Sequence, residues 1–288
     1  MVVGAQKSGT TSLHHYLGFH PSVFLPATKE TKFFVDPERY QNGPSYYREE
    51  YFGSVQAGQT AGEVDPDYMY FSEALDRMQS CLDVSKLKII FLLRDPVERA
   101  FSHYLMTLRR GHEPLSFGDA VQAEAERLST AAYFDRMHYS YVDRGRYVGQ
   151  IRRFLEVFDR QNTLVLFTEE LEHSPADLMH SVFEFIGVDG SGFVGETERF
   201  HQAEVPRNLW LLRRIKQADT LEKRILRGLV PSALRAKWRA SLLQMNQKPN
   251  SGENAVTMEK EVRVQLRDHY RPFDQQLVEL VGRALPWQ

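Results

Sequence analysis

Apolar runs alternate along the chain with stretches whose apolar residues recur at helical spacing. Lys88–Leu93 is a continuous apolar run, which is typical of a strand buried on both faces of a sheet. Met1–Ala5 and Thr163–Thr168 are interpreted as two further strands. The helices expected after these runs cover about Thr10–Phe19, a segment that begins at Asp95-Pro96, Gly145–Phe158, and Pro175–Ile186 closed by Gly187.

Strands that alternate with helices predict βαβ units and hence a mostly parallel sheet. From Val205 onward the pattern is helical, except for an irregular stretch over Asn246–Thr257. Asp36–Ala61 is polar and rich in aromatic residues, without a strong period. No repeat, low-complexity tract or convincing linker divides the chain. We therefore expect one α/β domain over residues 1–288, with a helical C-terminal part.

The composition is that of an ordinary globular protein, with 42% hydrophobic and 26% charged residues and a formal net charge of −2. The lack of a basic excess argues against a protein that coats nucleic acid. No apolar run approaches the ~20 residues of a membrane span. The single cysteine excludes internal disulfides and Cys-rich zinc sites, and we expect a cytoplasmic protein. Because the chain starts abruptly on a strand, we interpret it as part of a larger polypeptide.

The first apolar run leads into a loop rich in glycine and hydroxyl residues. Gly4 and Gly9 have the spacing of the phosphate loop GxxxxGK[ST], but Thr10 replaces its lysine and Lys7 lies three residues earlier. Ahead of a helix, such a loop presents backbone N–H groups and a positive helix end to an anion. A plain strand–turn–helix corner is the alternative interpretation. The expected anion-binding residues are Lys7, Ser8, Gly9, Thr10, Thr11 and Ser12.

The displaced lysine argues against a nucleoside-triphosphatase, which also needs an acidic residue for magnesium at another strand end. The run Lys88–Leu93 instead ends in Arg94, where open α/β sheets bind ligands. Ser102 follows about two helical turns after Asp95, so a guanidinium and a hydroxyl can form a phosphate clamp. Alone, Arg-Asp-Pro is better explained as an ion pair with a helix cap. Beside the first loop, it predicts a ligand with two separated phosphate groups.

Together the two loops resemble those of the sulfotransferases that use 3′-phosphoadenosine 5′-phosphosulfate (PAPS). Gln6–Leu13 is similar to the motif that holds the 5′-phosphosulfate, and Leu93–Pro96 through Ser102 to the motif that holds the 3′-phosphate. The likeness is to the heparan sulfate sulfotransferase branch and its bacterial relatives, and it covers most of the chain. It extends to His20-Pro21, Lys29–Phe34, Glu63–Tyr68 and Leu277–Arg283.

The resemblance implies a P-loop-like three-layer α/β fold with a central sheet. It also implies transfer of a sulfuryl group from PAPS to an acceptor hydroxyl, on a carbohydrate, a lipid or a carrier-bound acyl chain, with release of 3′-phosphoadenosine 5′-phosphate (PAP). The transferred group is less anionic than a γ-phosphate, so no metal is required. Two alternatives stay open: a domain that binds PAP without catalysis, and a small-molecule kinase on a related fold.

The resemblance assigns catalytic roles to three residues. Lys7 would stabilise charge between the sulfur and the 5′-phosphate, Glu30 would be the general base, and Lys32 would orient the acceptor or stabilise charge. From spacing alone, Glu30 is better explained as a surface carboxylate paired with Lys29 or Lys32. The other candidate bases are, in order, Asp65 and then His14, His15 and His103.

Two positions depart from that branch. Val64 stands where a lysine commonly follows the glutamate, which is the feature that keeps the non-catalytic alternative open. The family's late cofactor loop often reads Lys-Gly-Arg, and its nearest match here is Lys248–Gly252. From that segment, Lys248 and Asn250 are the expected cofactor contacts.

Overall fold

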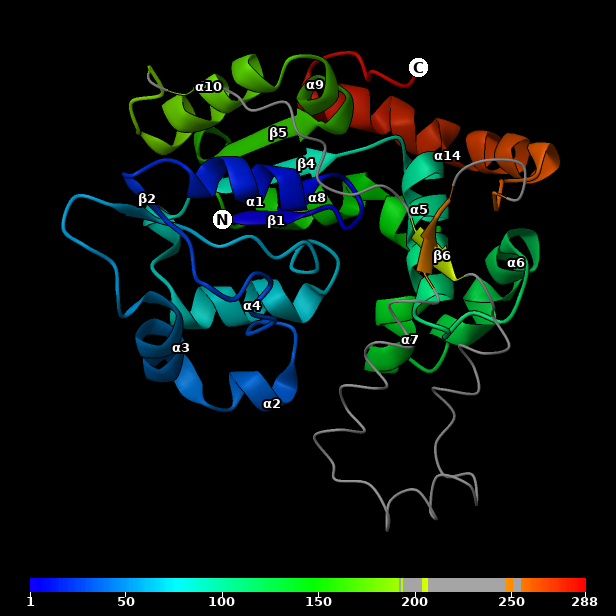
Figure 1. Ribbon diagram of the computed structural model, residues 1–288, viewed down its shortest axis with the longest axis horizontal. Helices are drawn as coiled ribbons and strands as arrows, with labels where there is room; N and C mark the ends of the chain where they lie inside the picture. The colour runs from blue at the N-terminus through cyan, green and yellow to red at the C-terminus, as the bar shows by residue number, and fades with distance from the viewer. Residues whose placement is uncertain (192, 194–203, 207–246, 251–254) are drawn as a thin grey trace, which may run out of the picture. The chain divides into compact units, whose positions relative to one another are not determined.

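The computed structural model describes residues 1–191, 193, 204–206, 247–250 and 255–288 (Figure 1). These residues group into two compact units. The first comprises Met1–Arg99, Val142–Phe200 and Gln265–Gln288, and the second Ala100–Tyr141 and His201–Val264. The expectation of a single domain over residues 1–288 stays a prediction.

The first unit carries the sheet and most of the helices. Its elements are, in chain order, β1 (Val2–Gly4), α1 (Thr10–Gly18), β2 (Val23–Phe24), α2 (Pro37–Tyr40), α3 (Gly43–Phe52), β3 (Thr60–Ala61), α4 (Ser72–Cys81), the 3-10 turn η1 (Val84–Lys86), β4 (Ile89–Leu93), the 3-10 turn η2 (Asp143–Gly145), α8 (Tyr147–Leu155), the 3-10 turn η3 (Arg160–Asn162), β5 (Thr163–Phe167), α9 (Thr168–His173) and α10 (Pro175–Ile186).

The sheet of this unit is parallel, in the order β1-β4-β5, as the alternating pattern predicts. β4 lies in the middle, and all five of its residues are buried. It pairs with β5 in continuous register from Ile89 opposite Thr163 to Leu93 opposite Phe167. Because the strands are parallel, the segments that follow β1, β4 and β5 meet at one edge of the sheet. β2 and β3 form a separate two-stranded parallel pair.

Helices cover both faces of the sheet. Ile90 and Leu92 of β4 pack into a buried cluster with Leu13 of α1 and Val182 of α10. Phe91, which alternates with them along the strand, contacts the ring of Phe154 on α8, with ring centroids 5.3 Å apart. The sheet is therefore the middle layer of three, with α1 and α10 on one face and α8 on the other (Figure 1).

The second unit is described by itself. It contains α6 (Phe117–Leu128), α7 (Tyr133–His138) and an antiparallel pair, β6 (Glu204–Pro206) with β7 (Gln247–Pro249). Phe117 of α6 packs against Phe101 and Tyr104, with ring centroids 5.1 and 5.2 Å apart. Two helices, α5 (Pro96–Arg109) and α14 (Lys260–Val281), contribute residues to both units. Within the described residues, no helix is long and apolar enough to cross a membrane.

The helix ends follow the expected chemistry. Asp95 caps α5 by accepting a hydrogen bond from the backbone N–H of Val97 at 2.9 Å, and Pro96 is the first helical residue. α10 ends at Ile186 and is capped by Gly187, whose φ of 75° is the left-handed conformation that favours glycine. These boundaries of α5 and α10 confirm the predicted ones.

The structure differs from the expected pattern in three places. α8 runs from Tyr147 to Leu155 rather than from Gly145 to Phe158, and at its start residues 143–145 form the turn η2. The aperiodic stretch over 36–61 contains α2 and α3, of whose residues only Tyr47 is buried, so no apolar period was visible. Val205 and Lys248 lie opposite each other in β6 and β7, where a helix and an irregular stretch were expected. α14 confirms a helix in the C-terminal part, and the helical pattern expected over residues 207–245 lies outside the described residues.

Gly145 offers a test of the packing in the first unit. A Cβ atom at this position would lie 2.7 Å from Cζ of Tyr270, whose hydroxyl donates to the Val142 carbonyl at 2.8 Å. We expect Gly145→Ala to lower the free energy of unfolding by about 1–3 kcal/mol, measured by urea denaturation. Gly149→Ala is the matched control, because nothing lies within 4 Å of its added methyl group. Equal urea midpoints for both variants would contradict this packing.

Candidate active site

The loop between β1 and α1 forms a turn directly ahead of a helix N-terminus. The Ser8 N–H donates to the Ala5 carbonyl at 3.2 Å, and the Gly9 carbonyl accepts from the N–H groups of Ser12 and Leu13. Gly9 has φ of 88°, a left-handed value that other residues rarely adopt. The backbone therefore forms the turn ahead of a helix that the two glycines predict, and binding of an anion by this loop stays a prediction.

Ser8 is fully buried, yet its hydroxyl has no hydrogen-bond partner among the described residues. Thr10, the next hydroxyl residue in the loop, is 4% exposed. Buried hydroxyl groups are rarely left unpaired, because an unmade hydrogen bond costs about 1–3 kcal/mol. A phosphate or sulfate oxygen would satisfy this donor. The loop therefore fits the 5′ end of a nucleotide such as PAPS.

Residues that follow β4 and β5 form hydrogen bonds with the backbone of this loop. The Thr168 hydroxyl lies 2.7 Å from the Ser8 carbonyl oxygen and 2.9 Å from that of Leu93, and it can donate to either. Arg94 donates from Nη1 to the Lys7 carbonyl at 3.2 Å, and its own carbonyl accepts from the Tyr147 hydroxyl at 2.8 Å. A guanidinium has five N–H donors, so Arg94 retains donors for a phosphate.

The other predicted cofactor contacts lie apart from this loop in the chain. Ser102 belongs to the second unit, and its role in a 3′-phosphate clamp stays a prediction. Lys248 lies in β7, and its side chain is outside the described part of the structure. The Asn250 side chain donates from Nδ2 to the Val256 carbonyl at 2.9 Å, and its Oδ1 accepts from the Val256 N–H at 2.7 Å. Its cofactor role also stays a prediction.

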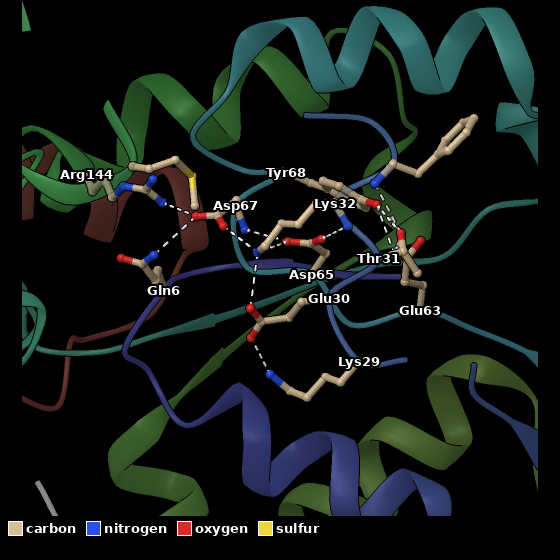
Figure 2. Close-up of polar contacts among 12 residues, drawn as sticks. Gln6, Lys29, Glu30, Thr31, Lys32, Glu63, Asp65, Asp67, Tyr68 and Arg144 are labelled. Atoms are coloured by element: carbon tan, nitrogen blue, oxygen red, sulfur yellow. Dashed lines mark hydrogen bonds and ion pairs between the residues drawn. The ribbon is translucent and has the colours of Figure 1, made fainter. Parts of the chain in front are cut away.

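A cluster of charged side chains surrounds Lys32 (Figure 2). The Lys32 ammonium lies 2.8 Å from Asp65 Oδ1 and 3.1 Å from Glu30 Oε2, and it also contacts Asp67. Glu30 pairs in addition with Lys29. Both ion pairs that the sequence suggested for Glu30 are therefore present, and they lie in a partly buried network rather than on an open surface.

Between Glu30 and Lys32, Thr31 anchors the same loop to a buried carboxylate. Its hydroxyl donates to Glu63, which is 2% exposed and also accepts from the Tyr68 hydroxyl at 2.9 Å and from Tyr47. Burial raises the pKa of Glu63 above its ordinary value, although these hydroxyl groups oppose the shift. The hydrogen bond from Thr31 to the buried Glu63 thus fixes the loop that carries Glu30 and Lys32.

Backbone strain coincides with the predicted catalytic residues. Among the described residues other than glycine, four have left-handed φ values. Three of them are the predicted catalytic residues, Lys7 at 71°, Glu30 at 59° and Lys32 at 58°. The fourth is Ala131, at 52°. Such residues cost on the order of 1–3 kcal/mol each and cluster at functional sites, where surrounding contacts impose the conformation. This observation supports the assignment of these three residues to one site.

The charges of the cluster are set by its contacts. Burial raises the pKa of Glu30, but Lys32 and Lys29 outweigh burial and hold the pKa below its ordinary value. Burial lowers the pKa of Lys32, but Asp67, Asp65 and Glu30 outweigh this effect and raise it. At neutral pH, Glu30 is therefore a carboxylate and Lys32 an ammonium. Burial raises the pKa of Asp65 to about 7.

Exposure separates the candidate bases. The Glu30 side chain is 34% exposed, whereas those of Asp65 and Asp67 are 0% and 1% exposed. Asp65 is further held by the Lys32 backbone N–H at 2.8 Å. Of the carboxylates that contact Lys32, Glu30 is therefore the one that a substrate can reach. Burial lowers the pKa of His14, so this histidine is neutral at pH 7.

Several residues of the site were missed by the sequence analysis. Asp67 belongs to the Glu63–Tyr68 motif, but nothing in that motif assigned it a role. Arg144 lies 77 residues away in the chain, and its contact with Asp67 leaves no local pattern. Thr168 could have been found, because it ends a predicted strand of a parallel sheet. The described residues contain no group of three or more side chains suited to a metal ion.

Comparison with known proteins agrees with this geometry. Residues 1–230 match the family described as Sulfotransferase domain. The chain is 27% identical to mouse (Mus musculus) heparan sulfate glucosamine 3-O-sulfotransferase 3B1 over 292 residues, which covers 100% of this chain and 64% of that relative. It is 31% identical to human (Homo sapiens) bifunctional heparan sulfate N-deacetylase/N-sulfotransferase 3 over 200 residues, covering 65% of this chain and 22% of the relative.

A solved structure shows the same fold. The crystal structure of a sulfotransferase from Alicyclobacillus acidocaldarius has a TM-score of 0.70 and 24% sequence identity, and the match covers 99% of this chain and 95% of that one. The chain spans less than two thirds of the length of the curated relatives named above. With most of its length matched by the family, the chain belongs to the sulfotransferase domain family, whose enzymes use PAPS as the sulfuryl donor.

Proposed function

We propose that this chain transfers the sulfuryl group of PAPS to a hydroxyl group of a carbohydrate, a lipid or a carrier-bound acyl chain, and releases PAP. The observation that carries the proposal is the pairing of two features in one compact unit. One is a phosphate loop with a buried, unpaired Ser8 hydroxyl, as judged from the described residues. The other is Glu30, an ionised carboxylate that a substrate can reach.

In this proposal the phosphate loop grips the 5′ end of the donor. The backbone N–H groups of Gly9, Thr10 and Thr11 at the N-terminus of α1 face the anion, and the Ser8 hydroxyl gains its missing partner. Lys7 stabilises the negative charge that grows on the oxygen between sulfur and phosphorus. Arg94 uses its remaining donors for the 3′-phosphate, with Ser102, Lys248 and Asn250 as the further expected contacts.

Glu30 accepts the proton of the acceptor hydroxyl, which attacks the sulfur in line with the departing oxygen. Lys32 orients the acceptor or stabilises the charge of the transferring group. The negative charge in this reaction is met by lysine and arginine side chains, and the proposal therefore requires no metal. The kinase alternative needs magnesium held by an acidic group, which the position of Arg94 at the end of β4 does not supply.

The acceptor class rests on similarity alone. The names of the matching relatives include a glucosamine 3-O-sulfotransferase and N-sulfotransferases of heparan sulfate. A glucosamine-containing oligosaccharide is therefore the first acceptor to test with radiolabelled PAPS, followed by a glycolipid and a hydroxyacyl chain on a carrier. PAP binding without sulfation of any of these acceptors would favour the non-catalytic alternative.

Nucleotide binding provides a direct test of the donor site. We expect PAP to bind more tightly than adenosine 5′-phosphate, which lacks the 3′-phosphate, in isothermal titration calorimetry. Arg94→Ala should weaken PAP binding about 10–100-fold, because a hydrogen bond to a charged group contributes about 1.5–3 kcal/mol. It should weaken adenosine 5′-phosphate binding less, because there Arg94 acts only through its hydrogen bond to the Lys7 carbonyl. Arg271→Ala is the control, since this arginine is exposed and forms its ion pair with Asp268 of the same helix, α14. Tighter binding of ATP with magnesium than of PAP would overturn the proposal.

A further inference from the structure

Asp67 joins three separate segments of the first unit (Figure 2). Its carboxylate accepts a hydrogen bond from Gln6 Nε2 at 3.3 Å, and it also contacts the Lys32 ammonium and the Arg144 guanidinium. The Asp67 side chain is 1% exposed. One buried carboxylate therefore has donors from the phosphate loop, from the loop that carries Glu30, and from η2.

The two loops that meet at Asp67 carry the predicted chemistry. Gln6 immediately precedes Lys7 in the phosphate loop, and Lys32 is paired with Glu30 at 3.1 Å. A continuous chain of contacts therefore runs from Gln6 through Asp67 and Lys32 to Glu30. Every residue in it lies in the first compact unit.

Asp67 also sets the orientation of the Gln6 side-chain amide. An ionised carboxylate only accepts hydrogen bonds, so the amide nitrogen of Gln6 faces Asp67, and its carbonyl oxygen faces elsewhere. Gln6 is 9% exposed, and this oxygen has no partner among the described residues. The site thus holds a buried, unused acceptor one residue before Lys7, suited to a hydroxyl or N–H donor of a bound substrate.

We infer that Asp67 is a positioning residue that fixes the position of the phosphate loop relative to the loop that carries Glu30. The inference rests on the proposed function, because it gives the two loops their donor and acceptor roles. Asp67 touches neither reacting group and acts through Gln6 and Lys32. Its carboxylate also contacts both the Lys32 ammonium and the Arg144 guanidinium and offsets part of their positive charge.

This role has an electrostatic consequence at Glu30. The charged or titratable groups that act on Glu30 are Lys32, Lys29, Asp67 and His14. The negative charge of Asp67 raises the pKa of Glu30 and opposes the two lysines. Removing that charge should therefore lower the pKa of Glu30 further, which a purely structural role for Asp67 would not do.

The test compares Asp67→Asn with the wild-type chain in two measurements that need no acceptor. The first follows the Glu30 carboxyl carbon by ¹³C NMR during a pH titration, with Glu30→Gln used to assign the signal. The second measures the affinity for PAP by calorimetry. We expect a lower Glu30 pKa and PAP binding weakened about tenfold, because one amide oxygen must replace a carboxylate that serves three donors. An unchanged pKa together with unchanged PAP affinity overturns the inference.

Two further variants keep the result decisive. Glu113→Gln removes a buried carboxylate that pairs with Arg127 in the second unit, and it should lower the melting temperature without moving the Glu30 pKa. Gln6→Met breaks the link to the phosphate loop without changing charge. If Asp67→Asn fails to fold, Gln6→Met should still weaken PAP binding, and normal affinity in this variant overturns the inference. A wild-type chain that does not bind PAP overturns the proposed function instead.

Discussion

Replacing Lys7 by alanine is expected to slow sulfuryl transfer by about 10²–10³-fold, the loss typical of removing one group that stabilises charge in a transition state. Lys7 lies in the turn before α1, next to the buried Ser8 hydroxyl, and its backbone is held at φ of 71°. The charge that it meets grows only as the bond between sulfur and oxygen breaks. The rate should therefore fall more than the affinity for PAP.

Single-turnover transfer of radiolabelled sulfate, alongside PAP calorimetry, separates the two effects. Lys7→Arg keeps the charge but changes the shape of the cation, and it should recover part of the rate. Lys86→Ala is the control, because this lysine is 82% exposed and its ion pair is with Asp83, three residues earlier in the chain. If Lys7→Ala weakens PAP binding 100-fold and leaves the single-turnover rate intact, Lys7 is a binding residue with no catalytic role.

The elements that position this loop could be predicted because their signals are local. In β4, Ile90 and Phe91 face opposite helix layers, so the strand is apolar at every position. Asp95-Pro96 marks the start of α5 by chemistry confined to a single turn. Both features leave a pattern within a few residues of sequence, and the predicted end of β4 at Leu93 and start of α5 at Pro96 are confirmed.

The interior of the site could not be predicted in the same way. Asp67 and Arg144 are 77 residues apart, and Asp67 and Lys32 are 35 apart, so their pairing follows from the folded chain alone. α3 could not be predicted for a different reason. It buries only Tyr47, so its sequence shows no amphipathic period. Sequence reasoning named Glu30 and Lys32 through a family resemblance, but the carboxylates that fix Lys32 became visible only in the structure.

The same contacts define what Glu30 should do. Glu30→Gln is expected to lower kcat by about 10²–10⁴-fold, the range for loss of a general base, with little change in PAP affinity. Glu38→Gln is the control, since Glu38 is an exposed carboxylate in the next helix along the chain. A Glu30→Gln variant that retains full kcat would exclude Glu30 as the base.

The pH profile then distinguishes Glu30 from Asp65. A general base is active when deprotonated, so activity is lost as the pH falls through its pKa. Lys32 and Lys29, against the effect of burial, hold the pKa of Glu30 below its ordinary value, and burial raises the pKa of Asp65 to about 7. If Glu30 is the base, activity stays level as the pH falls from 7 to 5. If Asp65 were the base, activity would already be halved near pH 7, and Asp65→Asn rather than Glu30→Gln would abolish it.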